Sequence, residues 1–224
     1  MINHVLVIPD GNRRFAKSKN IDLGVVYKFI SDYTTTGLIK FFLLGHNSKE
    51  LTIYGVSRDN VLKRSKKDLE PIYDAQTDLY SRWLKDKEIM SKVKFRFIGD
   101  RKILPKNYQS IIKSLENTTS KNTNGICNIL AGYSGQWETL EAIKKANEKK
   151  EELDFDNYDS FLEIQTPIDL VIRTGFEKRL SNCPMYQAAY AELVFTDYFY
   201  PELTMDKLQE IVKAYEKRER RYGK

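Results

Sequence analysis

Hydrophobic and polar positions follow two different spacings along this chain. Short runs rich in β-branched and aromatic residues are separated by longer segments whose apolar positions recur about every 3.6 residues, as on one helix face. The clearest longer segment covers residues 69–84, where Leu69, Ile72, Tyr73 and Trp83 share such a face. The short runs have the length and composition of strands. The six predicted strands are residues 4–8, 51–56, 93–98, 125–131, 169–173 and 192–196.

Strands that alternate with helical segments predict an α/β fold, in which a six-stranded, mostly parallel sheet is flanked by helices. Helices are predicted over 137–150 and at the C-terminal end, where residues 201–204 provide the start. Residues 116–124 predict a polar loop, and 149–159 predict a solvated segment that begins a short helix. Neither segment marks a domain boundary, and the sequence shows no internal repeat. We therefore expect a single domain over residues 1–224.

Composition and charge narrow the class of protein. The chain has 224 residues, 41% of them hydrophobic, and a formal net charge of +6, which suits one globular domain. No apolar stretch approaches the roughly 20 residues of a membrane-spanning helix, and the N-terminus lacks a signal-peptide pattern, so we expect a cytoplasmic protein. Cys127 and Cys183 stand in no CxxC pattern and predict neither a disulfide framework nor a zinc site. The basic C-terminal end favours anionic partners, and charge alone leaves nucleic acid, lipid headgroups and diphosphates open.

Polar residues gather directly after the first predicted strand, which stops at Pro9. Glycine lets backbone N–H groups come close to an anion, and an arginine can bind a phosphate through two hydrogen bonds. A neighbouring aspartate supplies the carboxylate that Mg²⁺ takes together with phosphate oxygens. This segment predicts a site for a diphosphate and a magnesium ion, although a lone aspartate after a strand is more often a helix cap. The residues that follow Pro9 are Asp10, Gly11, Asn12, Arg13 and Arg14.

A second polar cluster follows the fifth predicted strand and contains Arg173, Arg179 and Ser181. Two guanidinium groups around a glycine turn predict a second diphosphate site, with an ordinary salt-bridged surface loop as the alternative. Glu192 is a candidate second carboxylate for the metal, and a solvated glutamate at a strand edge is the alternative. The carboxyl ends of parallel strands meet at one edge of a sheet, so we expect the clusters after strands one, two, four and five to converge there. Motifs of P-loop, dinucleotide-binding, serine-hydrolase and zinc-protease sites are absent from the sequence.

These residues resemble the motifs of the cis-prenyltransferases, the family that includes undecaprenyl diphosphate synthase. The resemblance covers nearly the whole chain and keeps the motifs in order. It implies the family's fold with a hydrophobic tunnel, Mg²⁺ as cofactor, prenyl diphosphates as substrates and a homodimer, and it leaves peripheral membrane contact open. A nucleic-acid-binding module is disfavoured, because the positive charge is dispersed and no reader fold is recognisable. The matching segments are 10–17, 51–57 with Asn60, 97–100, 128–137, 167–175, 179–182, 187–197 and 218–223.

The resemblance also implies roles for individual residues. Asp10 would handle the magnesium ion and a diphosphate, and the residues after it would cradle the allylic diphosphate. The later arginine cluster would hold the second substrate, and Arg221 and Gly223 would act near the partner's site in a dimer. Ser57 and Asn60 would line the reacting centre, where Ser57 or Asn12 could take up a proton. The candidate catalytic residues are Asp10, Asn12 and Ser57; the metal ligands are Asp10 and Glu192; the substrate-binding residues are Gly11, Arg13, Arg14, Asn60, Arg173, Arg179, Ser181, Arg221 and Gly223.

The chain departs from the family pattern at several positions. Where chain-elongating members carry an arginine and a histidine shortly after the first motif, this chain has Leu23 and Tyr27. The usual glycine between asparagine and arginine is Arg13, the usual Trp-x-Arg-Pro is Val-Leu-Lys-Arg over 61–64, and GGRW is Ser-Gly-Gln-Trp over 134–137. These departures favour the atypical branch that makes lavandulyl-type, head-to-middle couplings. The alternatives are a standard head-to-tail synthase that uses isopentenyl diphosphate, and a non-catalytic partner subunit.

The apolar face of the 69–84 helix, together with Phe29, Phe41 and Phe42, is predicted to be core. Part of it can instead line the tunnel, because a prenyl tail needs a long dry cavity. The hypothesis from bulk alone is that Tyr73, Tyr80 and Trp83 limit the depth of that tunnel.

Overall fold

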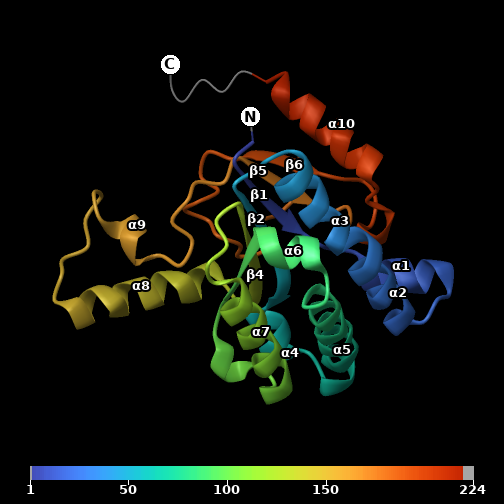
Figure 1. The fold of residues 1–224 in the computed structure, drawn as a ribbon, viewed down its shortest axis with the longest axis horizontal. Helices are drawn as coiled ribbons and strands as arrows, with labels where there is room; N and C mark the ends of the chain where they lie inside the picture. The colour runs from blue at the N-terminus through green and yellow to red at the C-terminus, as the bar shows by residue number, and fades with distance from the viewer. Residues whose placement is uncertain (1, 219–224) are drawn as a thin grey trace.

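A computed structural model describes residues 2–218 of the chain, and its centre is one six-stranded sheet (Figure 1). The strand order is β3-β4-β2-β1-β5-β6, and every neighbouring pair runs parallel, so the sheet is wholly parallel where the sequence predicted mostly parallel. All six predicted strands are present, with ends shifted by at most two residues. Their bounds are β1 His4–Ile8, β2 Glu50–Ser57, β3 Val93–Ile98, β4 Gly125–Tyr133, β5 Leu170–Arg173 and β6 Glu192–Phe195.

The two faces of the sheet pack into different cores, because successive strand residues point to opposite faces. Val7 contributes to the larger core, which the sheet shares with α5 (Lys66–Trp83), α7 (Lys106–Thr119) and α10 (Met205–Glu216). Its neighbour Leu6 contributes to the smaller core, which lies under the irregular segments before and after β5. Both faces are therefore covered, which explains why the strands are almost continuously apolar.

Residues 23–45 form one continuous helical run that the sequence pattern did not predict. Two π-helical stretches interrupt its regular turns, and π-helical turns are frequent at functional sites. Thr36 stabilises the first of them, because its hydroxyl donates a 3.1 Å hydrogen bond to the Ser31 carbonyl five residues earlier. Trp83 of α5 donates to the same hydroxyl at 3.0 Å and so attaches the run to the next layer. The run consists of α2 Leu23–Phe29, η1 Ile30–Thr35, α3 Thr36–Leu38 and η2 Ile39–Gly45.

Two boundary predictions need correction. Helix α7 continues to Thr119, so the first part of the predicted 116–124 loop is helical; Thr119 is buried and accepts a 3.1 Å hydrogen bond from the Phe95 N–H of β3. The short helix expected within 149–159 starts only at Tyr158. Thr204 caps α10 as predicted. The remaining elements are α1 Asn12–Lys19, α4 Arg58–Lys63, α6 Lys87–Lys92, η3 Arg101–Ile103, α8 Gly135–Lys149, α9 Tyr158–Phe161 and η4 Tyr200–Glu202.

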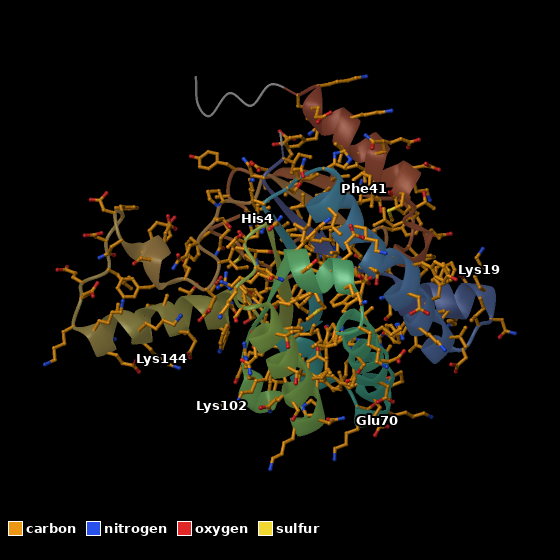
Figure 2. All side chains as sticks on the ribbon, viewed as in Figure 1. His4, Lys19, Phe41, Glu70, Lys102 and Lys144 are labelled. Atoms are coloured by element: carbon orange, nitrogen blue, oxygen red, sulfur yellow. The ribbon has the colours of Figure 1, made fainter. Side chains whose placement is uncertain are left out.

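The buried histidine and cysteine side chains have structural roles in the core. His4 lies among the central side chains, whereas Lys19 and Lys144 lie at the periphery (Figure 2). The His4 Nε2 is 2.8 Å from the Thr52 hydroxyl. Burial lowers the pKa of the His4 imidazole, and Glu50 has a smaller, opposite effect. Both cysteines are free and buried, as expected, and burial raises the pKa of Cys183 to about 12. Within residues 2–218, no helix is both long and apolar enough to cross a membrane.

Candidate active site

A cavity of about 830 Å³ opens at the carboxyl edge of the sheet, where the polar clusters were expected to meet. Its walls come from the loops after β1, β2, β4 and β5, together with α2, η1 and α5. The volume lies in the upper part of the range of roughly 300–1,000 Å³ that is typical of small-molecule sites. The structure thus brings most predicted site residues together. Those lining the cavity are Asp10, Gly11, Asn12, Arg13, Arg14, Ser57, Asn60, Arg173, Arg179 and Ser181.

Two glycines let the loops after β1 and β5 touch each other. Gly11 and Gly175 adopt φ values of 96° and 90°, in the left-handed region that side chains rarely occupy. A Cβ at Gly175 would lie 2.8 Å from the Asp10 carbonyl carbon, and one at Gly11 would lie 2.3 Å from the Phe199 ring. The close approach sets the position of Asp10 relative to the arginine that ends β5.

Arg173 and Asp10 form the central ion pair of the site. The Arg173 side chain is 3% exposed, and it donates 2.7 Å hydrogen bonds to Asp10 Oδ2 and to the Ser181 hydroxyl. Asp10 Oδ1 accepts from the Gly11 N–H at 2.6 Å and from Arg14 at 3.3 Å. The N-cap of α1 is Gly11, with no side chain bonded to the first turn, so Asp10 is not the helix cap that the simpler interpretation predicted. The N–H groups of that turn are left for a ligand.

The loop after β5 holds a residue that the sequence analysis missed. Glu177 lines the cavity and accepts from Arg14 at 3.0 Å and from Arg179, so one carboxylate joins an arginine of α1 to an arginine of the loop after β5. Phe176, Ser181 and Asn182 in this loop have positive φ, which costs free energy in non-glycine residues and is concentrated at functional sites. The sequence signal that could have identified Glu177 is its position as an acidic residue inside an otherwise basic stretch.

Within residues 2–218, two buried polar atoms without hydrogen-bond partners belong to residues that line this cavity. Among the described residues, Asn12 Oδ1 and Arg173 Nε are buried and have no hydrogen-bond partner. Both residues line the cavity, and buried polar groups are normally satisfied. The unsatisfied acceptor and donor are explained by a ligand with both donor and acceptor atoms, or by water.

The donor set fits a magnesium ion held together with substrate. Mg²⁺ usually binds one or two carboxylates and takes its other ligands from phosphate and water. A carboxylate offers about four acceptor positions, and Asp10, which is 30% exposed, uses three in the bonds described above. Residues 2–218 contain no group of three acidic, histidine or cysteine side chains placed to hold a metal. Asp10 therefore fits as a single protein ligand.

The structure does not bring Glu192 to Asp10. Glu192 begins β6 and pairs with Leu170, whereas Arg173, beside Asp10, pairs with Phe195 at the other end of that strand. Asp10 lies two further residues beyond Ile8, which pairs with Arg173, and at about 3.3 Å per residue the whole separation exceeds the reach of two ligands of one magnesium ion. Glu192 pairs instead with Arg218, so a metal shared with Asp10 of the same chain was a wrong interpretation. Arg221 and Gly223 lie outside the described residues.

The deeper part of the cavity is apolar. Helix α5 presents one face to it, and Trp83 and Tyr80 are nearly completely buried there. Tyr73 does not line the cavity, so its predicted role in limiting depth is not supported; Phe29 is 44% exposed and does not belong to the core. We call the lining residues Ile53, Ile72, Leu79, Tyr80, Trp83 and Ile129 the apolar interior. We call the lining residues Asp10, Arg13, Arg14, Lys17, Asp59, Arg64, Arg173, Glu177 and Arg179 the charged rim.

Comparison with known proteins identifies the family. A family model described as "Putative undecaprenyl diphosphate synthase" matches residues 8–223. A Pyrobaculum aerophilum protein, named tritrans,polycis-undecaprenyl-diphosphate synthase (geranylgeranyl-diphosphate specific), is 37% identical over 99% of this chain and 95% of its own length. A Buchnera aphidicola ditrans,polycis-undecaprenyl-diphosphate synthase ((2E,6E)-farnesyl-diphosphate specific) is 34% identical over 99% of this chain and 91% of its own.

Two crystal structures share the fold over the whole chain. A probable undecaprenyl diphosphate synthase from Campylobacter jejuni superposes with a TM-score of 0.84 and 28% identity, covering 100% of this chain and 99% of that one. Lavandulyl diphosphate synthase from Lavandula x intermedia, in complex with dimethylallyl diphosphate, superposes with a TM-score of 0.86 and 26% identity, covering 100% and 98%. The chain therefore belongs to the prenyltransferase family of undecaprenyl diphosphate synthase.

Proposed function

We propose that this protein transfers a prenyl group from an allylic diphosphate to a second prenyl substrate and releases diphosphate. The observation that carries the proposal is one cavity in which a charged rim adjoins an apolar interior. A prenyl diphosphate has the same division, with a charged head and a hydrocarbon tail. The interior serves as the tunnel for that tail, and Tyr80 and Trp83 limit its depth.

The first step breaks the bond between the allylic carbon and oxygen, and the diphosphate leaves with the electron pair. Arg14 and the free N–H groups at the start of α1 stabilise the charge that develops on the leaving oxygen. One preorganised donor of this kind is worth on the order of 3 kcal/mol. Magnesium bound at Asp10 would supply further charge neutralisation for the diphosphate.

The second substrate is held by Arg173, Arg179 and Ser181, which lie together on the other side of Asp10. Its double bond supplies the electron pair of the new carbon–carbon bond, and the carbocation that results loses a proton. Ser57, Asn12 or a diphosphate oxygen accepts that proton. The Ser57 hydroxyl caps α4 by accepting the Asn60 N–H at 3.0 Å, and its own proton stays free to rearrange.

Two couplings are candidates, and each has an observation in its favour. Leu23 and Tyr27, in place of the usual arginine and histidine, favour an atypical head-to-middle coupling. Full-length relatives named undecaprenyl diphosphate synthases favour regular head-to-tail addition of isopentenyl diphosphate. The size of the cavity, typical of small-molecule sites, favours short products in either case.

The test is to incubate purified protein with magnesium, dimethylallyl diphosphate and isopentenyl diphosphate, with and without a longer allylic partner. Diphosphate release would be measured, and the product would be identified by mass spectrometry and NMR. A branched head-to-middle skeleton supports the atypical coupling, and a regular cis-linked chain supports head-to-tail addition. If the protein binds the diphosphates but never turns them over, it is a non-catalytic partner subunit. A sedimentation measurement would test the homodimer in the same preparation, and flotation with vesicles would test membrane contact.

A further inference from the structure

Three of the departures from the family pattern meet in space. Arg13 replaces the usual glycine, Tyr27 the usual histidine, and Arg64 the usual proline. They come from α1, α2 and the link between α4 and α5, and all three line the cavity. The Arg64 guanidinium interacts with the Tyr27 hydroxyl and lies in the field of Arg13. Changes at three distant positions of the chain have thus built one cluster.

Both the backbone and the side chain of Arg64 interact with neighbouring residues. Its backbone N–H donates a 3.0 Å hydrogen bond to the Asn60 carbonyl and ends α4. Its partly buried side chain extends into the cavity, where Tyr27 is 7% exposed. An arginine held in this way loses less conformational freedom when it binds an anion than an arginine on a mobile surface loop.

The charges of the rim fall into two groups. Arg14, Arg173 and Arg179 each pair with a carboxylate of the rim. The second group, which we call the unpaired cluster, has no carboxylate within 4.0 Å in the part of the chain from residue 2 to 218. Its members are Arg13, Lys17 and Arg64.

The unpaired cluster is unfavourable without an anion. Arg13 and Lys17 lie four residues apart on α1, and like charges at that spacing destabilise a helix. Burial, followed by the field of Arg13, lowers the pKa of the Arg64 guanidinium, while Tyr27 and, to a lesser extent, Asp68 act in the opposite direction. Three cations that line one cavity and pair with none of its carboxylates fit an anion with several oxygens.

We propose that Arg64, together with Arg13 and Lys17, binds the diphosphate of the allylic donor and replaces the cationic residues that Leu23 and Tyr27 have displaced. The donor is assigned here because Arg13 belongs to the first turn of α1, whose residues line the same cavity. Arg14 serves the same diphosphate, and Arg173 and Arg179 remain for the second substrate. Tyr27 is a positioning residue that orients Arg64. This assignment rests on the proposed prenyl transfer.

The test measures binding of dimethylallyl thiolodiphosphate, an unreactive donor analogue, by titration calorimetry with magnesium present. Arg64→Gln is expected to raise the dissociation constant roughly tenfold, the value of one charge-assisted hydrogen bond, and Arg64→Lys less. Lys67→Gln removes an exposed positive charge three residues away, outside the cavity, and should leave the dissociation constant unchanged. If the dissociation constant of Arg64→Gln for the analogue is within about twofold of that of the unmodified protein, the assignment is wrong. It is also wrong if the unmodified protein does not bind the analogue.

Steady-state kinetics separates this assignment from the proposed function. Arg64→Gln should raise the KM for the allylic donor and leave the KM for isopentenyl diphosphate unchanged. Tyr27→Phe should produce a smaller rise, and the double variant should show less than the sum of the two effects, since both act through one guanidinium. If the unmodified protein and Arg64→Gln both turn over with the same donor KM, only the role of Arg64 is overturned. Binding that depends on Arg64 without any turnover overturns the proposed transfer only.

Discussion

The charged rim and the apolar interior of the cavity are built in different ways. The rim comes from the segments that follow β1, β2 and β5, including helix α1, so its residues are placed by strand ends and by that helix. The interior comes from one face of α5 and from strand residues, and its depth depends on how Tyr80 and Trp83 pack. Rim substitutions should therefore change the rate or the affinity for diphosphates, and interior substitutions should change the length of the product.

The largest expected effect belongs to Asp10. Asp10→Asn removes the charge that orients Arg173 and the rim carboxylate that fits magnesium, so we expect diphosphate release to fall about 10³-fold. The product should keep its identity, because the interior is untouched. Asp74→Asn, an exposed neutralisation on α5, is the matched control. Unchanged turnover in Asp10→Asn would remove Asp10 from the mechanism.

Arg173→Gln should have the next largest effect. The substitution removes a charged donor that contacts both Asp10 and Ser181, so the KM for the second substrate should rise roughly tenfold or more while the donor KM changes little. Arg173→Lys should recover only part of the loss, because a lysine lacks the planar fork. An equal rise in both KM values would mean that the rim is one undivided anion site.

Glu177→Gln should have a smaller effect, and it should strengthen the binding of diphosphate, whereas Arg173→Gln should weaken it. Its carboxylate holds Arg14 and Arg179, and both pairs are partly exposed, where such pairs are typically worth about 0.2–1 kcal/mol. Releasing the two arginines should therefore tighten the binding of inorganic pyrophosphate about two- to fivefold. Weaker binding would show that Glu177 positions the arginines and does not compete with the ligand.

Trp83 tests the interior and should affect the rate least. Trp83→Ala should lengthen the product detected by mass spectrometry, and Trp83→Phe should lengthen it less. Tyr73→Phe, on the same helix but away from the cavity, should leave product length unchanged. Replacing a buried tryptophan with alanine costs about 3–5 kcal/mol of stability, so the comparison is best made at low temperature. Unchanged products in Trp83→Ala would show that the interior does not set chain length.

The rim could be predicted because its residues are contiguous in the sequence and follow recognisable strands. Asp10 and Arg173 end neighbouring parallel strands, which is enough to predict that they meet. Glu192 was misplaced because its metal role came from its residue type and from the resemblance, although the predicted strand 192–196 already put it at the end of β6 away from the site. Arg64 and Glu177 depend on how loops fold back over the sheet edge, and no spacing rule encodes that.

The interior was predicted less well for a related reason. Six strands follow from local composition, but the helical run over 23–45 contains three glycines, three successive threonines and two π-helical stretches, which obscure the helical period. The apolar face of α5 was found, yet periodicity could not tell Tyr73, which does not line the cavity, from Trp83, which does. Packing of the whole molecule decides which residues of one face border empty space.

The central claim is that the rim binds two diphosphates while their prenyl chains enter the interior. A crystal structure with magnesium, dimethylallyl thiolodiphosphate and isopentenyl diphosphate tests it most directly. The account predicts one diphosphate between the start of α1 and Arg64, a second on Arg173, Arg179 and Ser181, and a hydrocarbon chain directed toward Trp83. Diphosphates bound elsewhere, or a single diphosphate shared by both groups of cations, would contradict it.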